Sequence, residues 1–183
     1  MKKGLFLAMF MLCLPLTTQA QSNLFGAGSM VAGANIDLSA LQLGYGASFE
    51  YGITNSIGIK PAIVIHNYDL GTTQWSFTVI DAWATYHFSG GGFLSFMDPK
   101  KLDNYAMLGA SFVSFGVESS TGGSEETSSS FGFGGGAGSR YYFNDKLSFS
   151  AEGKYRLASF STDSYTLAIG WYTLSVGVSY AIN

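Results

Sequence analysis

Side chains that could do acid–base chemistry are scarce in this 183-residue sequence, which contains only two histidines. A lipid-modifying acyltransferase or deacylase would need a histidine base close to a serine nucleophile. His66 and His87 fall on the same face of two extended segments but near opposite ends of them, so they are not expected to share a site. Each is better explained as a hydrogen-bonded structural residue. We therefore predict no catalytic residues and no enzymatic activity.

The sequence contains few of the residues that a metal site, a cofactor site or a nucleic-acid-binding surface would need. Two separated histidines and a single cysteine, Cys13, do not make a metal site. The run Gly132–Gly138 is rich in glycine, but neither a Lys-Ser/Thr pair nor a helical pattern follows it, as a phosphate-binding loop would require. The net charge of −3 provides no basic patch for phosphates. We predict no metal, no cofactor and no nucleic-acid partner.

The elements that position these residues are strands, because nearly all of the sequence after Ser22 alternates with a period of two. Between Leu41 and Ile53, odd positions are apolar and even positions are polar or glycine. Tight turns are predicted at 54–56 and 144–146. Longer connections are predicted at 67–75, 89–103, 117–130 and 160–170.

The pattern predicts eight strands. Two of them, Leu24–Asn35 and Tyr105–Val117, are strand-like without a clear division into two faces. Elsewhere the polar face is mostly glycine, serine and alanine, which suits the inside of a narrow closed barrel. The apolar face carries aromatic residues near strand ends, as the interfacial girdles of membrane barrels do. The predicted fold is therefore all-β: an eight-stranded antiparallel up-and-down transmembrane β-barrel.

The composition agrees with a membrane location for such a barrel. Charged residues make up 11% of the chain, against roughly 25% in an ordinary soluble domain. Aromatic residues reach 16%, and there are 24 glycines. No stretch of about 18 apolar residues occurs, which excludes a helical membrane span.

The first twenty residues are predicted to be a cleaved signal peptide. Lys2 and Lys3 form a positive region, an apolar run extends from Gly4 to Leu16, and small residues precede a cleavage site after Ala20. Residues 1–20 are then removed on export, and residues 21–183 form the barrel domain.

Seven charged residues fall on the polar face and are predicted to form an interior ion-pair network, since the inside of a membrane barrel is the place where charges can pair. If the tight turns pair their flanking residues, Glu50 lies opposite Lys60, and Lys154 faces Gly136. Long cations opposite glycines solve a packing problem as well as an electrostatic one. An alternative is that these groups bind trapped water without a defined network. The seven residues are Glu50, Lys60, Asp81, Arg140, Glu152, Lys154 and Arg156.

The hairpin from Gly134 to Tyr155 resembles the small outer-membrane β-barrel family, of which the OmpA membrane domain and OmpX are familiar types. A glycine-rich strand with an aromatic end leads into the turn Asn144-Asp145-Lys146 and then into Ala151-Glu152-Gly153-Lys154-Tyr155. The resemblance extends over essentially the whole mature chain. It implies insertion by the barrel assembly machinery, both termini in the periplasm, and long loops outside the cell.

The expected function is that of a non-enzymatic integral outer-membrane barrel with a structural or surface-interaction role. Outer-membrane lipid would surround it, and any surface partner would bind through the connections 67–75, 117–130 and 160–170. Passage of larger solutes is disfavoured because an eight-stranded lumen is filled by side chains. One alternative is a soluble exported barrel that binds a small apolar ligand, which a charged, glycine-lined inner face disfavours. A lipid-modifying outer-membrane enzyme is a further alternative.

Overall fold

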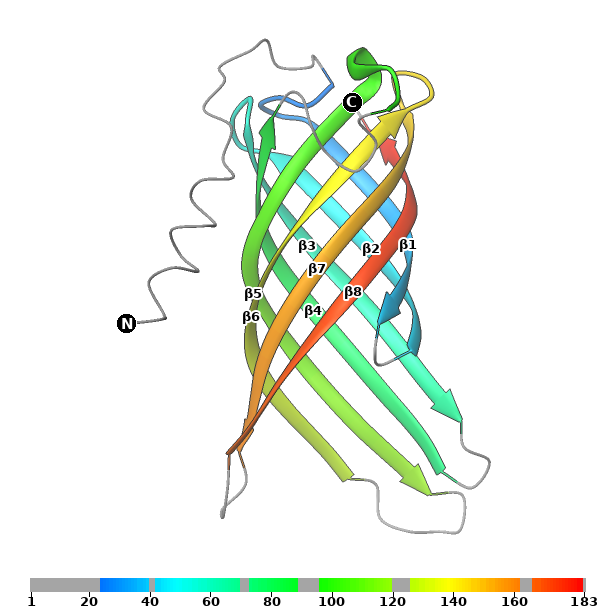
Figure 1. Cartoon of the computed structure of the whole chain (residues 1–183), viewed down its shortest axis with the longest axis vertical. Coiled ribbons are helices and arrows are strands. Elements are labelled where there is room, and N and C mark those ends of the chain that lie inside the picture. Colours follow the sequence, from blue (N-terminus) through cyan, green and yellow to red (C-terminus); the bar gives the residue numbers. More distant parts are fainter. Residues whose placement is uncertain are drawn as a thin grey trace.

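The computed structural model describes residues 24–39, 42–69, 73–88, 96–119, 126–161 and 166–182. They form a closed barrel in which each strand is antiparallel to its neighbours and the last strand pairs with the first (Figure 1). This architecture confirms the predicted eight-stranded up-and-down fold. The strands are β1 (Met30–Ser39), β2 (Gln42–Gly52), β3 (Ile57–Asp69), β4 (Thr73–Phe88), β5 (Leu102–Ser119), β6 (Glu126–Tyr142), β7 (Leu147–Ser161) and β8 (Thr166–Ala181).

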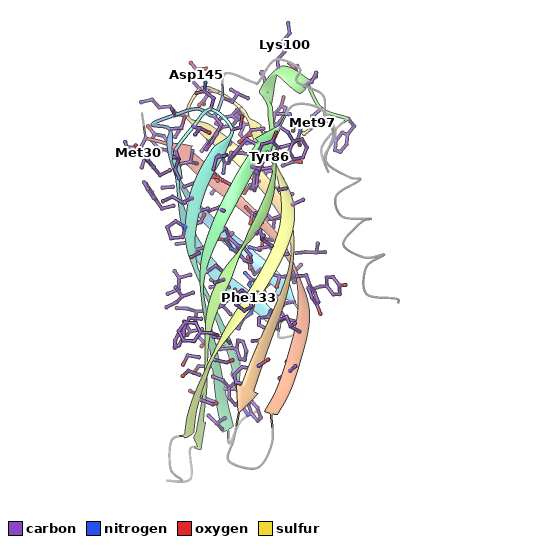
Figure 2. All side chains as sticks on the ribbon, turned by 90° about the vertical axis from the view of Figure 1, so that its left-hand side faces the viewer. Met30, Tyr86, Met97, Lys100, Phe133 and Asp145 are labelled. Atoms are coloured by element: carbon purple, nitrogen blue, oxygen red, sulfur yellow. The ribbon has the colours of Figure 1, made fainter. Side chains whose placement is uncertain are left out.

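The two ends of the barrel differ, and we name them for what they carry. The terminal end holds the tight turns at 53–56 and 143–146, the short 3-10 helix η1 (Pro99–Lys101) and the last residues of β8 (Figure 1). Figure 2 shows Lys100 and Asp145 projecting from this end. The loop end, opposite, holds the β1–β2, β3–β4, β5–β6 and β7–β8 connections. Within the described part of the chain, no helix is long and apolar enough to cross a membrane.

Short polar side chains hold the two tight turns. Thr54 Oγ1 accepts a hydrogen bond from the backbone N–H of Ile57 at 2.9 Å. Asn144 Oδ1 accepts hydrogen bonds from the backbone N–H groups of Lys146 and Leu147 at 2.9 and 2.8 Å. Such side chains satisfy the backbone donors of a turn and thereby set the register of the strands that follow.

The first strand differs from its prediction. The segment Leu24–Asn35 begins too early and ends too soon, because β1 runs from Met30 to Ser39. The residues before it, Leu24–Ser29, make turns across the terminal end instead of a ladder. The predicted signal peptide, 1–20, lies outside the described residues.

The connections predicted at 67–75, 117–130 and 160–170 are wrong in extent, because β3 to β8 continue into all three of them. Their polar residues suggested loops. In β4, Gln74 lies on the outward face while Phe77 and Val79 face the lumen, so this strand persists while its two faces exchange character. In β6, by contrast, Ser130 is buried on the inward face.

The exchange is clear in β4. On the side of the terminal end, Ile80 faces outward and is exposed, while Asp81 is buried inside. One step toward the loop end, Val79 is buried inside and Thr78 takes the outward face. The apolar residues of β4 therefore face outward on the terminal side of this point and inward on the loop side.

On β5 and β6 the outward face becomes polar at the positions paired with Thr78. Thr78 of β4 pairs with Ser114 of β5, and Ser114 pairs with Ser129 of β6. The inward neighbours at the same height are also paired, Val79 with Val113. We call this line of outward residues on β4, β5 and β6, namely Thr78, Ser114 and Ser129, the polarity level. A lipid–water boundary imposes such a change on the outside of a barrel.

Between the terminal end and the polarity level, the outer wall is largely apolar. Soluble monomers rarely expose contiguous apolar patches of more than a few hundred Å². Near the terminal end the exposed residues include Tyr51, Tyr86 and Tyr180, in the position of an interfacial aromatic girdle. Figure 2 labels Tyr86 near this end. Further exposed large apolar residues of this wall include Ile36, Leu38, Leu43, Ile57, Ile59, Ile63, Ile65, Leu108, Phe133, Leu157, Leu174, Val176 and Val178.

Candidate functional site

Buried polar and charged side chains of the described residues gather in the lumen. All seven charged residues predicted for the inner face are buried there. The register of β6 and β7 is as predicted, since Lys154 pairs with Gly136 and Arg156 with Gly134. Glu50 and Lys60 both point inward from neighbouring strands, but the ion pairs that they make reach across the lumen to other strands. The contacts divide into three clusters.

The first cluster lies at the terminal end. Arg140 donates from Nη2 to Glu50 Oε2 at 2.5 Å and from Nη1 to Asp103 Oδ2 at 3.2 Å. The ring of His87 lies between the same carboxylates, with Nδ1 2.7 Å from Asp103 Oδ1 and Nε2 3.0 Å from Glu50 Oε1. Thr85 donates to Glu50 Oε1 at 2.7 Å. Because both ring nitrogens of His87 face carboxylates, the doubly protonated ring satisfies both contacts.

The chain before β1 covers this cluster and closes the terminal end. Phe25 is buried and stacks on the His87 ring, with the ring centroids 3.5 Å apart and the planes inclined by 8°. The backbone N–H of Gly28 donates to Gly52 O at 2.8 Å, which ties the segment to the wall. We call Leu24–Ser29 the N-terminal cap.

The second cluster spans the middle of the lumen. Lys60 of β3 pairs with Glu152 of β7, and these strands stand on opposite sides of the ring. Lys154 Nζ lies 3.1 Å from Glu152 Oε2 and 3.5 Å from Asp37 Oδ2. The hydroxyl of Tyr105 donates to Glu152 Oε1 at 2.6 Å. The Lys60–Glu152 pair therefore forms a bridge through the barrel axis.

The third cluster lies on the loop side of the second. Arg156 donates to both oxygens of Asp81, from Nη2 at 2.5 Å and from Nε at 3.1 Å, which is the bidentate geometry of a strong pair. Ser111 donates to Asp81 Oδ1 at 2.6 Å. The guanidinium carbon of Arg156 lies 5.5 Å from the Trp83 ring centroid, within reach of a cation–π contact.

Charge is balanced across the three clusters. A buried charge is tolerated when an opposite charge and further hydrogen bonds compensate its lost hydration. With His87 protonated, each carboxylate of the lumen has a cation to match it, and the contacts connect strands from every side of the barrel. The carboxylates are Asp37, Glu50, Asp81, Asp103 and Glu152, and the cations are Lys60, His87, Arg140, Lys154 and Arg156.

Sequence reasoning missed Asp37 and Asp103 because both lie outside the predicted strands Leu24–Asn35 and Tyr105–Val117, whose faces were also not assigned. In β1, the alternation that places Asp37 inside is visible once the strand begins at Met30. In β5, no such signal exists, since Met107 inside and Leu108 outside are both large and apolar. Membership of His87 in the ion-pair network was not predicted either.

Beyond the third cluster, an apolar plug fills the lumen toward the loop end. Val113 is completely buried, and Trp171 is nearly so. The ring of Phe77 stands edge-on to Trp171, with centroids 6.1 Å apart. Sequence reasoning missed the plug because it assigned part of this region to loops. The plug consists of Val79, Val113, Ala158 and Trp171, with Phe77 and Phe160 packed against them.

The two histidines are placed as predicted, both inside and far apart. His66 pairs with Phe77 in the loop half of the barrel, and its ring packs over Gly44, where an added Cβ would lie 2.5 Å from the ring. His87 belongs to the first cluster, and its backbone N–H donates to Ser56 O in the tight turn at 2.7 Å. Among the residues that the structure describes, no three His, Cys, Asp or Glu side chains group in a way that could hold a metal ion.

Known proteins share this architecture. Residues 5–182 match the family model of the outer membrane protein beta-barrel domain. The N-terminal β-barrel domain of Pseudomonas aeruginosa OprF is similar in structure, with a TM-score of 0.62 and 19% identity over 86% of this chain and 99% of that chain. Neisserial surface protein A has a TM-score of 0.60 and 21% identity, over 83% of this chain and 94% of that one.

A third similar structure is Ail, the attachment invasion locus protein of Yersinia pestis, in complex with the heparin analogue sucrose octasulfate. Its TM-score is 0.54 at 16% identity, over 84% of this chain and 97% of that chain. No curated protein sequence matches this chain.

Proposed function

Because the chain belongs to the family of outer membrane protein β-barrel domains, we propose that it is a non-enzymatic integral barrel of the outer membrane with a structural or surface-interaction role. After removal of residues 1–20, the barrel domain would be inserted by the barrel assembly machinery. The terminal end would then face the periplasm and the loop end would face the outside of the cell.

The outer wall is the observation that carries this proposal. Its apolar surface ends at the polarity level marked by Thr78, Ser114 and Ser129, and polar residues continue the wall beyond it. Strands tilted by about 45° need roughly 9–11 residues to cross a bilayer. β4, with 16 residues, and β5, with 18, are long enough to cross and to continue into water.

The filled lumen supports a role other than transport. The N-terminal cap, the Lys60–Glu152 bridge and the apolar plug each occupy the barrel axis at a different height. Eight-stranded barrels have room for side chains and little else. Any recognition of other molecules would therefore fall to the loop end, at the connections 67–75, 117–130 and 160–170 and the strand ends that they contain.

Heat-modifiability tests the proposal directly. A closed barrel extracted from the outer-membrane fraction in detergent migrates faster on a gel when it is not boiled, because the sheet stays folded. We expect that faster band, and we expect it in the outer-membrane fraction. A soluble periplasmic protein without a mobility shift would refute the membrane assignment and favour a soluble ligand-binding barrel.

Two further measurements separate the proposed role from its rivals. In planar bilayers the purified protein should show no steady conductance, whereas a stable open channel would contradict the filled lumen. Cells that carry His66→Ala and His87→Gln should keep their lipid modification pattern. A lost modification in a variant that still shows the heat-dependent mobility shift would point to an enzyme.

A further inference from the structure

Two small residues make a low point in the apolar outer wall where β1 and β2 lie side by side. Ala34 of β1 pairs with Ala47 of β2, and both face outward and are exposed. Larger outward residues continue the same row, with Val178 of β8 beside Ala34 and Ile63 of β3 beside Ala47. The surface is therefore lowest at the two alanines and higher on either side of them.

Two hollows open over these alanines. The first has a volume of about 450 Å³ and reaches from Phe149 of β7, across β8 and Ala34 of β1, to Tyr45 of β2. The second has a volume of about 380 Å³ and reaches from Ala47 of β2 to Ile80 of β4. The hollows adjoin where Ala34 pairs with Ala47. We call the two hollows together the alanine groove.

The alanine groove runs obliquely across the apolar wall. On β7 it begins at Phe149, two residues after Leu147, where this strand starts at the terminal end. On β4 it ends at Ile80, two residues from Thr78 of the polarity level. The groove therefore starts near one boundary of the apolar wall and extends toward the other, as a lipid acyl chain does below its head group.

A cation stands where the groove approaches the terminal end. Lys146, in the tight turn between β6 and β7, is exposed, and its Nζ lies 5.9 Å from the centre of the Tyr180 ring. Tyr180 is the outward residue of β8 next to Val178, which lines the groove. Within the described part of the chain, Lys146 makes no salt bridge. Lysine and tyrosine at a membrane boundary lie at the level of the lipid head groups.

The same turn carries an acid beside this base. Asp145 precedes Lys146, is exposed and projects from the terminal end (Figure 2). The head group of phosphatidylethanolamine likewise carries two neighbouring charges, an anionic phosphate and a cationic ammonium. The turn and this head group are therefore complementary in charge, whereas a head group with a phosphate alone would leave Asp145 unmatched.

The shape of the groove favours an acyl chain over a second barrel. Association inside a bilayer depends on close van der Waals packing, because lipid tails are as apolar as the protein surface. A flexible chain can follow the hollows and contact Ala34 and Ala47. The wall of a second barrel is convex, so it would rest on rim residues such as Tyr45 and Val178 and leave the alanines uncovered.

We propose that the alanine groove and the turn at 144–146 bind one phosphatidylethanolamine molecule of the leaflet that faces the periplasm. One acyl chain lies in the groove, the phosphate accepts hydrogen bonds from Lys146 Nζ, and the ammonium group faces the Asp145 carboxylate. The site rests on the proposed function, since it needs the terminal end at the periplasmic boundary of the membrane.

Native mass spectrometry of the purified barrel, released from micelles with added lipid, tests this site. The added lipids are phosphatidylethanolamine and phosphatidylglycerol with identical acyl chains, in equal amounts. We expect one retained lipid per barrel, with phosphatidylethanolamine retained about threefold more often, the scale of one exposed charge contact. Equal retention of the two lipids, or none, would overturn the proposal. Lipid-free dimers would favour a second copy of the chain as the occupant.

Filling the groove tests the seat of the acyl chain. Ala34→Leu with Ala47→Leu should lower lipid retention about fivefold or more, because packing in the groove is lost. Ala82→Leu with Ala110→Leu is the matched control, since these alanines are also exposed and paired across two strands but lie outside the groove. The control should change retention less than about twofold. Equal losses would show general adhesion of lipid to the wall.

Charge variants test the head-group contacts. Lys146→Gln should lower the retention of both lipids about threefold, and Asp145→Asn should lower that of phosphatidylethanolamine alone. Lys100→Gln, which removes an exposed cation of the same end on η1, should change neither. An equal loss in Lys100→Gln would refute recognition at the turn. A barrel that shows the heat-dependent mobility shift in the outer-membrane fraction but retains no lipid would overturn this site and leave the proposed function standing.

Discussion

The terminal and loop halves of the lumen fill the same narrow space with opposite chemistry. In the terminal half, Glu50, Arg140 and their neighbours compensate one another across the barrel axis. In the loop half, Val113 and Trp171 form an apolar core of the kind found in soluble domains. In β4 and β5 the boundary between them lies where the outward face changes from apolar to polar.

The side chains that fill each half of the lumen are opposite in polarity to the outward face of the wall around that half. Where lipid would surround the wall, apolar side chains gain nothing by turning inward, and polar groups must be satisfied inside. Where water would surround it, the hydrophobic effect again drives apolar side chains inward. One continuous sheet thus contains an inside-out segment and a conventional one, and the predictions below test that division.

The largest effect is expected from breaking the charge balance of the terminal half. Arg140→Met leaves Glu50 and Asp103 without their shared guanidinium and should lower the free energy of unfolding by about 3–5 kcal/mol. Urea titration in micelles, followed by the mobility of unboiled samples, measures the change. Adding Glu50→Gln to the same chain should restore part of the loss, because one uncompensated charge is then gone. A single variant as stable as the original protein would show that this network contributes nothing to stability.

Truncation in the loop half should cost somewhat less. Trp171→Ala removes a buried ring from the apolar plug and should destabilise the protein by about 3 kcal/mol, the lower end for such changes, since the loop half can loosen by itself. Amide exchange should rise first in the loop-end residues of β7 and β8. Tyr172→Ala, at the exposed neighbouring position, is the matched control and should change stability little. Equal losses in the two variants would argue against a plug.

A third effect on folding stability is expected from charges placed on the outer wall below and at the polarity level. Leu108→Arg puts a charge on the apolar part of the outer wall and should cost about 2–4 kcal/mol in lipid vesicles, whereas Ser129→Arg at the level should cost about 0–1 kcal/mol. Folding equilibria in vesicles measure both. In detergent micelles the difference should shrink. Similar costs for both variants in vesicles would show that the level does not mark the edge of the hydrocarbon.

The smallest effect is expected at the N-terminal cap. Phe25→Ala removes the ring stacked on His87 and should lower the free energy of unfolding by about 1–2 kcal/mol, since the exposed end can rehydrate. Exchange of the Gly28 amide should quicken while the centre of the barrel stays protected. Ala27→Ser, in the same segment but exposed, serves as the control. Loss of protection throughout the barrel would mean that the cap is part of the cooperative core.

The sequence was most informative where a strand has one polar and one apolar face. That condition holds for β2 and for most of β3, β7 and β8, and it placed Glu50, Lys60 and Lys154 inside. It fails in β5, where both faces are apolar. Asp103 was also missed because the prediction placed it in the connection 89–103, whereas β5 begins at Leu102. Period-two alternation reports which residues share a face, and it needs contrast between the faces to say which one is buried.

The polarity contrast between the two faces also explains why the connections 67–75, 117–130 and 160–170 were predicted with the wrong extent. Beyond the polarity level the alternation continues with its sign reversed, as at Thr78 and Val79, and serine and threonine on the outward face look like loop residues. The ion pairs across the lumen are harder still to predict from the sequence. Alternation places Lys60 and Glu152 on inward faces, but their meeting depends on the closure of the ring, which no local pattern contains.

The pairing of β1 with β8 has a kinetic consequence. Val31 pairs with Ala181, so the contacts that complete the ring join residues separated by nearly the whole chain. Contacts of such high sequence separation carry the largest loop-closure entropy and slow folding. No ring can form until the last strand has been delivered, and the cross-lumen ion pairs cannot assemble before it. Insertion and closure are therefore expected to occur late and together, with an open sheet as the species at risk of aggregation.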